Sequence, residues 1–124
     1  MFIYYNANPY GRRVNDCTVR AISLASNRSW DDTYEELSDF ARIQGTMFDD
    51  VAYIDSYLDI KYDKIYSKKD GTITVEDFVR KNNRGIYLIT MLGHITCCID
   101  GIIYDTFNPG DHLVWDAYKV EKKR

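Results

Sequence analysis

GHITCCIDGIIYDT, residues 93–106, consists of two β-rich runs joined by Asp100-Gly101. An Asp-Gly pair between such runs is the strongest short signal for a hairpin turn of type I′. The turn sets the pairing of the two strands and makes His94 and Asp105 diagonal neighbours on one face. A slip of one residue would put the two side chains on opposite faces. The register therefore predicts contact between His94 and Asp105.

A candidate nucleophile precedes this hairpin in the chain. Cys17 lies in Asn15-Asp16-Cys17-Thr18, at the predicted start of a helix. Free N–H groups and the partial positive charge there stabilise a thiolate and supply a donor for an oxyanion. We expect Asp105 to accept the Nδ1 proton of His94 and leave Nε2 facing the thiol. Asp16 is expected to cap the helix, since a carboxylate beside a thiolate raises its pKa.

Apolar residues at helical spacing predict helices over about 16–26, 30–44, 48–58 and 75–81. Ser29 and Thr74 are the predicted N-caps of the second and fourth helices. Short β-rich runs predict strands at about 2–5, 62–66, 86–92, 94–99, 102–107 and 113–120. The chain is thus expected to form a single α+β domain over residues 1–124, with N-terminal helices packed on a C-terminal antiparallel sheet.

Composition excludes several classes of function. The 124 residues carry a net charge of -3, which argues against broad contact with nucleic acid phosphates. The basic clusters are expected to be solvated loops or termini: Arg12-Arg13, Lys68-Lys69 and Lys122-Lys123-Arg124. No apolar stretch approaches the roughly 18 residues of a membrane helix, and no signal peptide opens the chain, so we expect a cytoplasmic protein without a membrane partner.

Cysteine usage argues against disulfides and metals. Cys97 and Cys98 are adjacent on a predicted strand, so their side chains point to opposite faces. With three cysteines and no second Cys/His pair at zinc spacing, we expect a reduced protein with no metal and no cofactor. A free cysteine taken alone is more often a small core residue than a nucleophile. Only the hairpin register, which brings His94 and Asp105 together, favours Cys17 as an active-site residue.

The segments NDCTVRAI (residues 15–22) and GHITCCIDGIIYDT resemble the core of papain-like cysteine peptidases in a minimal form, of the kind found in phages and bacteria. The resemblance implies a papain-like fold with Cys17 as nucleophile, His94 as general base and Asp105 as orienting residue. Asn108 is the alternative for that third role. Relatives cleave peptide or isopeptide bonds, transfer acyl groups or deamidate glutamine, so a protein or peptide substrate is implied.

One position departs from the family pattern. Papain-like enzymes commonly carry an oxyanion-stabilising glutamine six residues before the cysteine, and Gly11 stands there in this chain. Asn15, Asn8 or Asn6, or a backbone N–H, are the candidate substitutes.

Two functions therefore remain open, and a third, cysteine-dependent cleavage of a nucleotide or small-molecule conjugate, has no phosphate-specific motif to support it. The first is a thiol-dependent hydrolase or acyltransferase acting on an amide, isopeptide or related acyl bond. The second is a non-catalytic papain-like protein, a phage-type effector that occupies a host protein in the host cytoplasm through a tyrosine-rich acidic surface. His112 remains an alternative base, although a turn residue is the simpler interpretation.

Overall fold

The computed structural model describes residues 1–48 and 50–121, with Val51 described by its backbone alone. Within those residues the helices are α1 (Cys17–Ser26), α2 (Trp30–Ile43), α3 (Val51–Lys61) and α4 (Val75–Lys81), with a 3₁₀ turn at Lys68–Asp70. The strands are β1 (Phe2–Tyr4), β2 (Asp63–Ser67), β3 (Ile86–Met91), β4 (His94–Ile99), β5 (Ile102–Asp105) and β6 (Asp116–Val120). The α+β class is confirmed.

The described strands form one sheet in the order β1-β5-β4-β3-β6-β2. The β4–β5 hairpin has the predicted register, with Cys98 opposite Ile103. Asp100 (φ 49°) and Gly101 (φ 81°) both have positive φ, as a type I′ turn requires. The expectation of an antiparallel sheet was wrong in one respect, because β1 joins the edge in parallel with β5. Parallel strands are joined by a long connection and not by a short turn, so the sequence contains no local signal that predicts this pairing.

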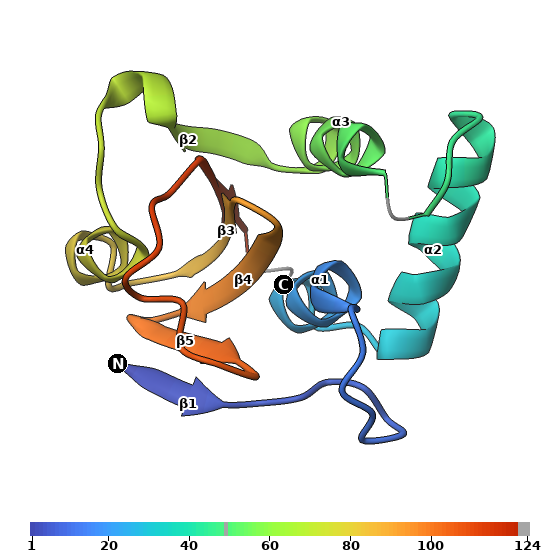
Figure 1. Ribbon diagram of the computed structural model, residues 1–124, viewed down its shortest axis with the longest axis horizontal. Helices are drawn as coiled ribbons and strands as arrows, with labels where there is room; N and C mark the ends of the chain where they lie inside the picture. Colours follow the sequence, from blue (N-terminus) through green and yellow to red (C-terminus); the bar gives the residue numbers. More distant parts are fainter. Residues whose placement is uncertain (49, 122–124) are drawn as a thin grey trace.

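Both faces of the sheet are covered by helices (Figure 1). One core cluster joins α1, α2 and α3 to the first face, where Leu88 and Cys97 are fully buried. The other cluster packs α4 on the opposite face, where Ile89 and Cys98 lie. The adjacent cysteines therefore point to opposite faces, as predicted. This arrangement buries β3 on both sides and places α1 between β4 and α2.

The predicted N-caps of two helices are confirmed. Ser29 accepts a hydrogen bond from the N–H of Asp32 at 3.0 Å, and Thr74 accepts one from Asp77 at 3.1 Å. The third helix begins later than predicted, at Val51, because the side chain of Asp50 caps it by accepting from the N–H of Ala52.

Several predicted boundaries shift or lie outside the described residues. Position 49, within the predicted third helix, and the basic cluster Lys122-Lys123-Arg124 lie outside the described part of the chain. β5 ends at Asp105 and β6 begins at Asp116, so both are shorter than predicted. Across the described ranges, no helix has the length and apolar character needed to cross a membrane.

Candidate active site

Cys17 is the first residue of α1, and its side chain is partly exposed. The sulfur interacts with the ring of His94 and with the backbone N–H of Ile95, both on β4. Val19 and Ile22 hold α1 in the core cluster that also contains Ile95. The buried face of α1 thus determines that its first residue lies over the start of β4.

His94 and Asp105 are joined by a hydrogen bond of 2.7 Å between Nε2 and Oδ2. The hairpin register predicts this contact, but the expected ring orientation was wrong, because Nε2 and not Nδ1 meets the carboxylate. Diagonal neighbours on a sheet are widely spaced, and Nε2 is the ring nitrogen farther from the backbone. Nδ1 is consequently the ring nitrogen left available for the hydrogen bond between His94 and Cys17.

The surroundings of the pair favour a thiolate and an imidazolium. Burial alone would lower the pKa of His94, but hydrogen bonds with Asp105 and Cys17 outweigh it and raise the pKa from 6.5 to about 9. Burial would raise the pKa of Cys17, yet His94, the N–H of Ile95 and the charge of Arg20 bring it below 9.0. The described contacts thus favour the thiolate of Cys17 and the imidazolium of His94 over their neutral forms.

The other two cysteines have the opposite character. Cys97 and Cys98 are fully buried. Burial raises the pKa of Cys97 strongly and that of Cys98 to about 11. Both are therefore inert core thiols near neutral pH, and Cys17 stands apart from them in exposure and in charge.

The first backbone N–H groups of α1 are left open. Asp16 occupies the N-cap position but makes no capping hydrogen bond, so the expected capping role was wrong. Its carboxylate instead accepts from Arg20 at 2.8 Å and from the indole N–H of Trp30 at 3.0 Å. Among the described residues, no acceptor meets the backbone N–H of Cys17 or Thr18. These N–H groups can therefore receive an oxyanion formed beside Cys17.

The asparagine candidates for the oxyanion role are placed differently from one another. Asn8 is buried and donates to Asp16 at 3.3 Å, while its Oδ1 accepts from the N–H of Tyr10. Asn6 is also committed to the same loop, through Arg12 and Asn8. Asn15 is exposed, two residues before Cys17, and makes no side-chain hydrogen bond to a described residue. Of the three, only Asn15 is free to turn toward a substrate.

Gly11 also lies on this loop, with φ 65°, and no heavy atom lies within 4 Å of the point that a Cβ would occupy there. It brings no side chain to the site.

His112 and Asn108, the alternatives for base and orienting residue, take no part in the contact between His94 and Asp105. Asn108 is exposed and uses its Oδ1 to accept the N–H of Gly110 at 3.0 Å, so Asp105 and not Asn108 contacts His94. His112 is exposed and packs against Phe107 at 6.1 Å between ring centroids. Phe107 in turn lies 4.7 Å from the His94 ring, so it covers one side of the imidazole.

Sequence reasoning missed Arg20. Its guanidinium contacts Asp105 Oδ1 at 3.3 Å and Thr106 Oγ1 at 3.1 Å, besides Asp16. The available signal was the Asp16–Arg20 spacing, since an acid and a base four residues apart on a helix form an ion pair. Nothing local in the sequence indicates that the same arginine reaches β5.

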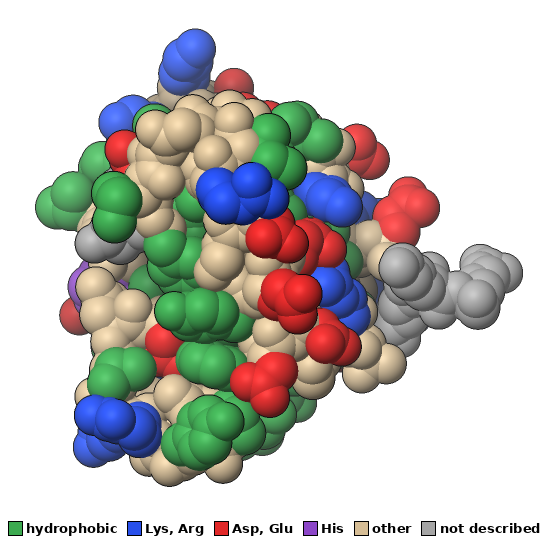
Figure 2. All heavy atoms as spheres, turned by 90° about the vertical axis from the view of Figure 1, so that its right-hand side faces the viewer, with side chains coloured by type: hydrophobic (Ala, Val, Ile, Leu, Met, Phe, Trp, Pro, Cys, Tyr) green, Lys and Arg blue, Asp and Glu red, His purple; other side chains and the backbone are tan. Residues whose placement is uncertain are grey.

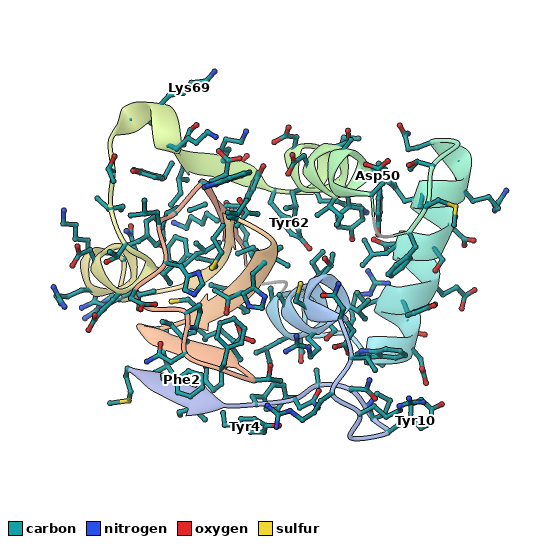
Figure 3. The ribbon with its side chains drawn as sticks, in the orientation of Figure 1. Phe2, Tyr4, Tyr10, Asp50, Tyr62 and Lys69 are labelled. Atoms are coloured by element: carbon teal, nitrogen blue, oxygen red, sulfur yellow. The ribbon has the colours of Figure 1, made fainter. Side chains whose placement is uncertain are left out.

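An aromatic row leads away from the site along the N-terminal loop and α2. Tyr10 lies on the loop between β1 and α1 (Figure 3) and contacts Trp30 edge-on, at 6.5 Å. Trp30, Tyr34 and Phe48 then follow at centroid distances of 5.1 and 4.9 Å. Trp30 thus links this row to Asp16, the residue before Cys17.

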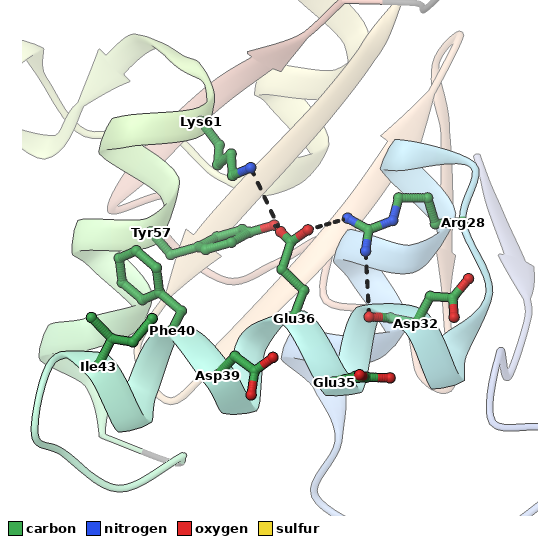
Figure 4. A pocket seen from close by; sticks show the side chains of 9 residues that line it. All are labelled: Arg28, Asp32, Glu35, Glu36, Asp39, Phe40, Ile43, Tyr57 and Lys61. Atoms are coloured by element: carbon green, nitrogen blue, oxygen red, sulfur yellow. Dashed lines mark hydrogen bonds and ion pairs between the residues drawn. The ribbon is translucent and has the colours of Figure 1, made fainter.

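A groove of about 530 Å³ lies between α2 and α3 and contains none of the predicted site residues (Figure 4). Glu36 is its centre, bonded to Arg28 at 2.7 Å and to the hydroxyl of Tyr57, with Lys61 at 3.8 Å. Figure 2 shows acidic side chains gathered on the same face of the molecule. The positive charges of Arg28 and Lys61 balance the negative charge of Glu36. The network therefore has a structural role, which is to join α2 to α3.

The chain matches no family model, and neither a curated protein nor a solved structure is significantly similar to it. Within the described residues, no group of three or more His, Cys, Asp or Glu side chains is arranged to hold a metal ion.

Proposed function

We propose that this chain is a thiol-dependent hydrolase or acyltransferase of papain-like type, acting on an amide, isopeptide or related acyl bond. The observation that carries the proposal is the contact series from Cys17 through His94 to Asp105, with the thiol at a helix start. Nucleophile, base and orienting group within hydrogen-bond reach of one another are the pattern of an activated nucleophile.

In the proposed reaction the thiolate of Cys17 attacks the substrate carbonyl carbon and forms an S–C bond. The carbonyl oxygen takes the electron pair, and the open N–H groups at the start of α1 bind it. His94 gives its Nδ1 proton to the leaving amine, and the C–N bond breaks to leave a thioester. Water or an acceptor amine then attacks the thioester, His94 takes the proton, and the thiolate leaves.

Asp105 has a supporting role in this scheme. It is 3% exposed, and although burial raises its pKa, the hydrogen bond from His94 helps to bring the pKa below 3.8. With its pKa lowered, Asp105 is ionised at neutral pH, so it keeps the Nε2 proton on His94 and stabilises the imidazolium.

The proposal includes a reducing, cytoplasmic setting and a protein or peptide substrate. All three cysteines are free, and the reaction requires Cys17 as a thiolate, which an oxidising compartment would not preserve. For a phage-encoded chain the setting would be the host cytoplasm and the substrate a host protein.

Acyl transfer to Cys17 is the direct test. With 4-nitrophenyl acetate as a generic acyl donor, we expect a burst of nitrophenol and an acetylated peptide containing Cys17, detected by mass spectrometry. At pH 6.5 iodoacetamide should alkylate Cys17 at least tenfold faster than Cys97 or Cys98. Cys17→Ser should abolish the burst, whereas Cys98→Ser serves as a matched control and should retain it. Acetylation spread equally over all three cysteines would contradict the proposal.

The second candidate is a binding protein that keeps this fold without turnover. It is favoured by the lack of a side chain at Gly11 and by exposed aromatic residues on the N-terminal segment, such as Tyr4 and Tyr10, which are 55% and 72% exposed. Tyrosine offers a large contact area at interfaces. Binding of a partner that survives both Cys17→Ser and His94→Ala, together with no acetylation of the wild type, would select this function.

A further inference from the structure

Arg20 carries a largely buried charge between two carboxylates. Its side chain is 11% exposed, with Nε 2.8 Å from Asp16 Oδ1 and Nη1 3.3 Å from Asp105 Oδ1. A guanidinium at this depth needs its partners, because a buried charge without them is costly. Arg20 therefore joins the residue before the thiol to the residue behind the imidazole.

The two oxygens of Asp105 have separate partners. Oδ1 accepts from Arg20 and from the backbone N–H of Thr106 at 2.7 Å, and Oδ2 contacts His94 at 2.7 Å. With both oxygens engaged, the carboxylate has one orientation about its last bond. That orientation determines where the ring of His94 points.

The same side chain connects two elements that are far apart in the sequence. Arg20 lies one helical turn after Cys17 on α1, and its Nη1 also donates to Thr106 Oγ1, just beyond β5, at 3.1 Å. A planar fork can contact both carboxylates at once, whereas an ammonium is a single point of charge.

We infer that Arg20 is a positioning residue, which holds Asp105, and through it His94, in the orientation that faces Cys17. The inference rests on the proposed function, because it assigns Arg20 to that same site. The hydrogen bonds of Arg20 go to Asp16, Asp105 and Thr106, so it acts on the orientation of His94 through Asp105.

The test compares Arg20→Lys and Arg20→Met with Arg28→Lys and Arg28→Met. Arg28 is a matched control, since it also pairs with a carboxylate but lies on the Glu36 network. Three quantities are measured for each variant: the pH dependence of Cys17 alkylation by iodoacetamide, the low-field proton resonance of the His94–Asp105 hydrogen bond, and the rate of acyl transfer from 4-nitrophenyl acetate.

Arg20→Lys keeps the charge and loses the fork, so it separates position from charge. We expect it to leave alkylation at pH 6.5 within about threefold of wild type, to broaden or abolish the low-field resonance, and to slow acyl transfer about tenfold or more. Arg20→Met should lose the resonance too and slow alkylation by more than the threefold allowed to Arg20→Lys, because the charge of Arg20 is among the groups that lower the pKa of Cys17. Both Arg28 variants should resemble wild type in all three measurements.

A wild-type resonance and wild-type acyl transfer in Arg20→Lys would overturn the inference, because charge alone would then suffice. If Arg20→Met fails to fold, Arg20→Lys and Thr106→Val give the answer, since each removes contacts of the same fork and keeps the charge. The proposed function fails separately, through a wild-type protein that neither reacts fast with iodoacetamide nor forms an acyl enzyme. The His94 resonance still reports on Arg20 in that case.

Discussion

Replacing His94 with alanine is expected to slow alkylation of Cys17 at pH 6.5 by about a hundredfold. A thiol with an ordinary pKa of about 8.5 is only about one per cent thiolate at this pH, and burial would raise its pKa further. In the wild type the ring of His94, the N–H of Ile95 and the charge of Arg20 all favour the thiolate. Rates of iodoacetamide labelling between pH 4 and 10, followed by mass spectrometry, measure the difference.

The pH dependence of acyl transfer follows from the directions in which the pKa values of Cys17 and His94 are shifted. The pKa of Cys17 is lowered, so thiolate persists below pH 9.0 and is lost only as the pH falls through the lowered value. The pKa of His94 is raised to about 9, so its proton is present below that pH and lost above it. Acyl transfer that needs both charges should therefore give a bell-shaped profile with its alkaline limb near pH 9.

Two variants sharpen this prediction. His112→Ala removes the other, exposed histidine and should leave the labelling rate unchanged. Asp105→Asn removes the carboxylate that helps to raise the pKa of His94, so the alkaline limb should move to lower pH. A His94→Ala protein that labels as fast as wild type would show that the helix start alone activates Cys17.

Replacing Asp16 with alanine is expected to destabilise the protein by about 3 kcal/mol. Asp16 is 7% exposed, and its carboxylate accepts from Arg20, Trp30 and Asn8. Its removal leaves the guanidinium with less compensation and two polar groups without their acceptor. Urea denaturation followed by far-UV circular dichroism measures the change in unfolding free energy.

The matched control is the exposed pair of Asp39 and Arg42, whose atoms are 3.9 Å apart on α2. Asp39→Ala should cost less than about 0.5 kcal/mol, because exposed ion pairs are screened by water and salt. The double variant Asp16→Ala, Arg20→Met should cost less than the sum of its two single changes, since it removes both members of the buried pair. A loss below about 1 kcal/mol for Asp16→Ala would mean that water replaces the carboxylate.

The contact between His94 and Asp105 could be predicted from the sequence because a two-residue turn determines every pairing along its hairpin. Helix caps could be predicted for the same reason: a hydroxyl and the N–H it binds are three residues apart. These are local relations, which the amino-acid sequence contains.

The missed features are long-range. Whether Asp16 caps its helix depends on Trp30 and Arg20 competing for the carboxylate, which only the packed structure decides. The choice of Nε2 over Nδ1 depends on the distance across the sheet, and the parallel pairing of β1 with β5 has no signal in either segment. From the sequence alone, Arg20 would be placed on the exposed surface of its helix. Only the folded structure brings Asp105 and Thr106 into contact with it.

The parallel pairing of β1 with β5, with Tyr4 opposite Asp105, brings together segments that are far apart in the sequence. The reactivity of Cys17 therefore depends on when these segments meet during folding. The segment that carries Cys17 precedes the segment that carries His94, so during synthesis α1 leaves the ribosome before its partner exists. Contacts of such large sequence separation form late and slowly. Until the hairpin docks, Cys17 lacks the contacts with His94 and the N–H of Ile95 that lower the pKa of its thiol. The appearance of thiolate absorbance during refolding therefore reports completion of the native topology rather than early collapse.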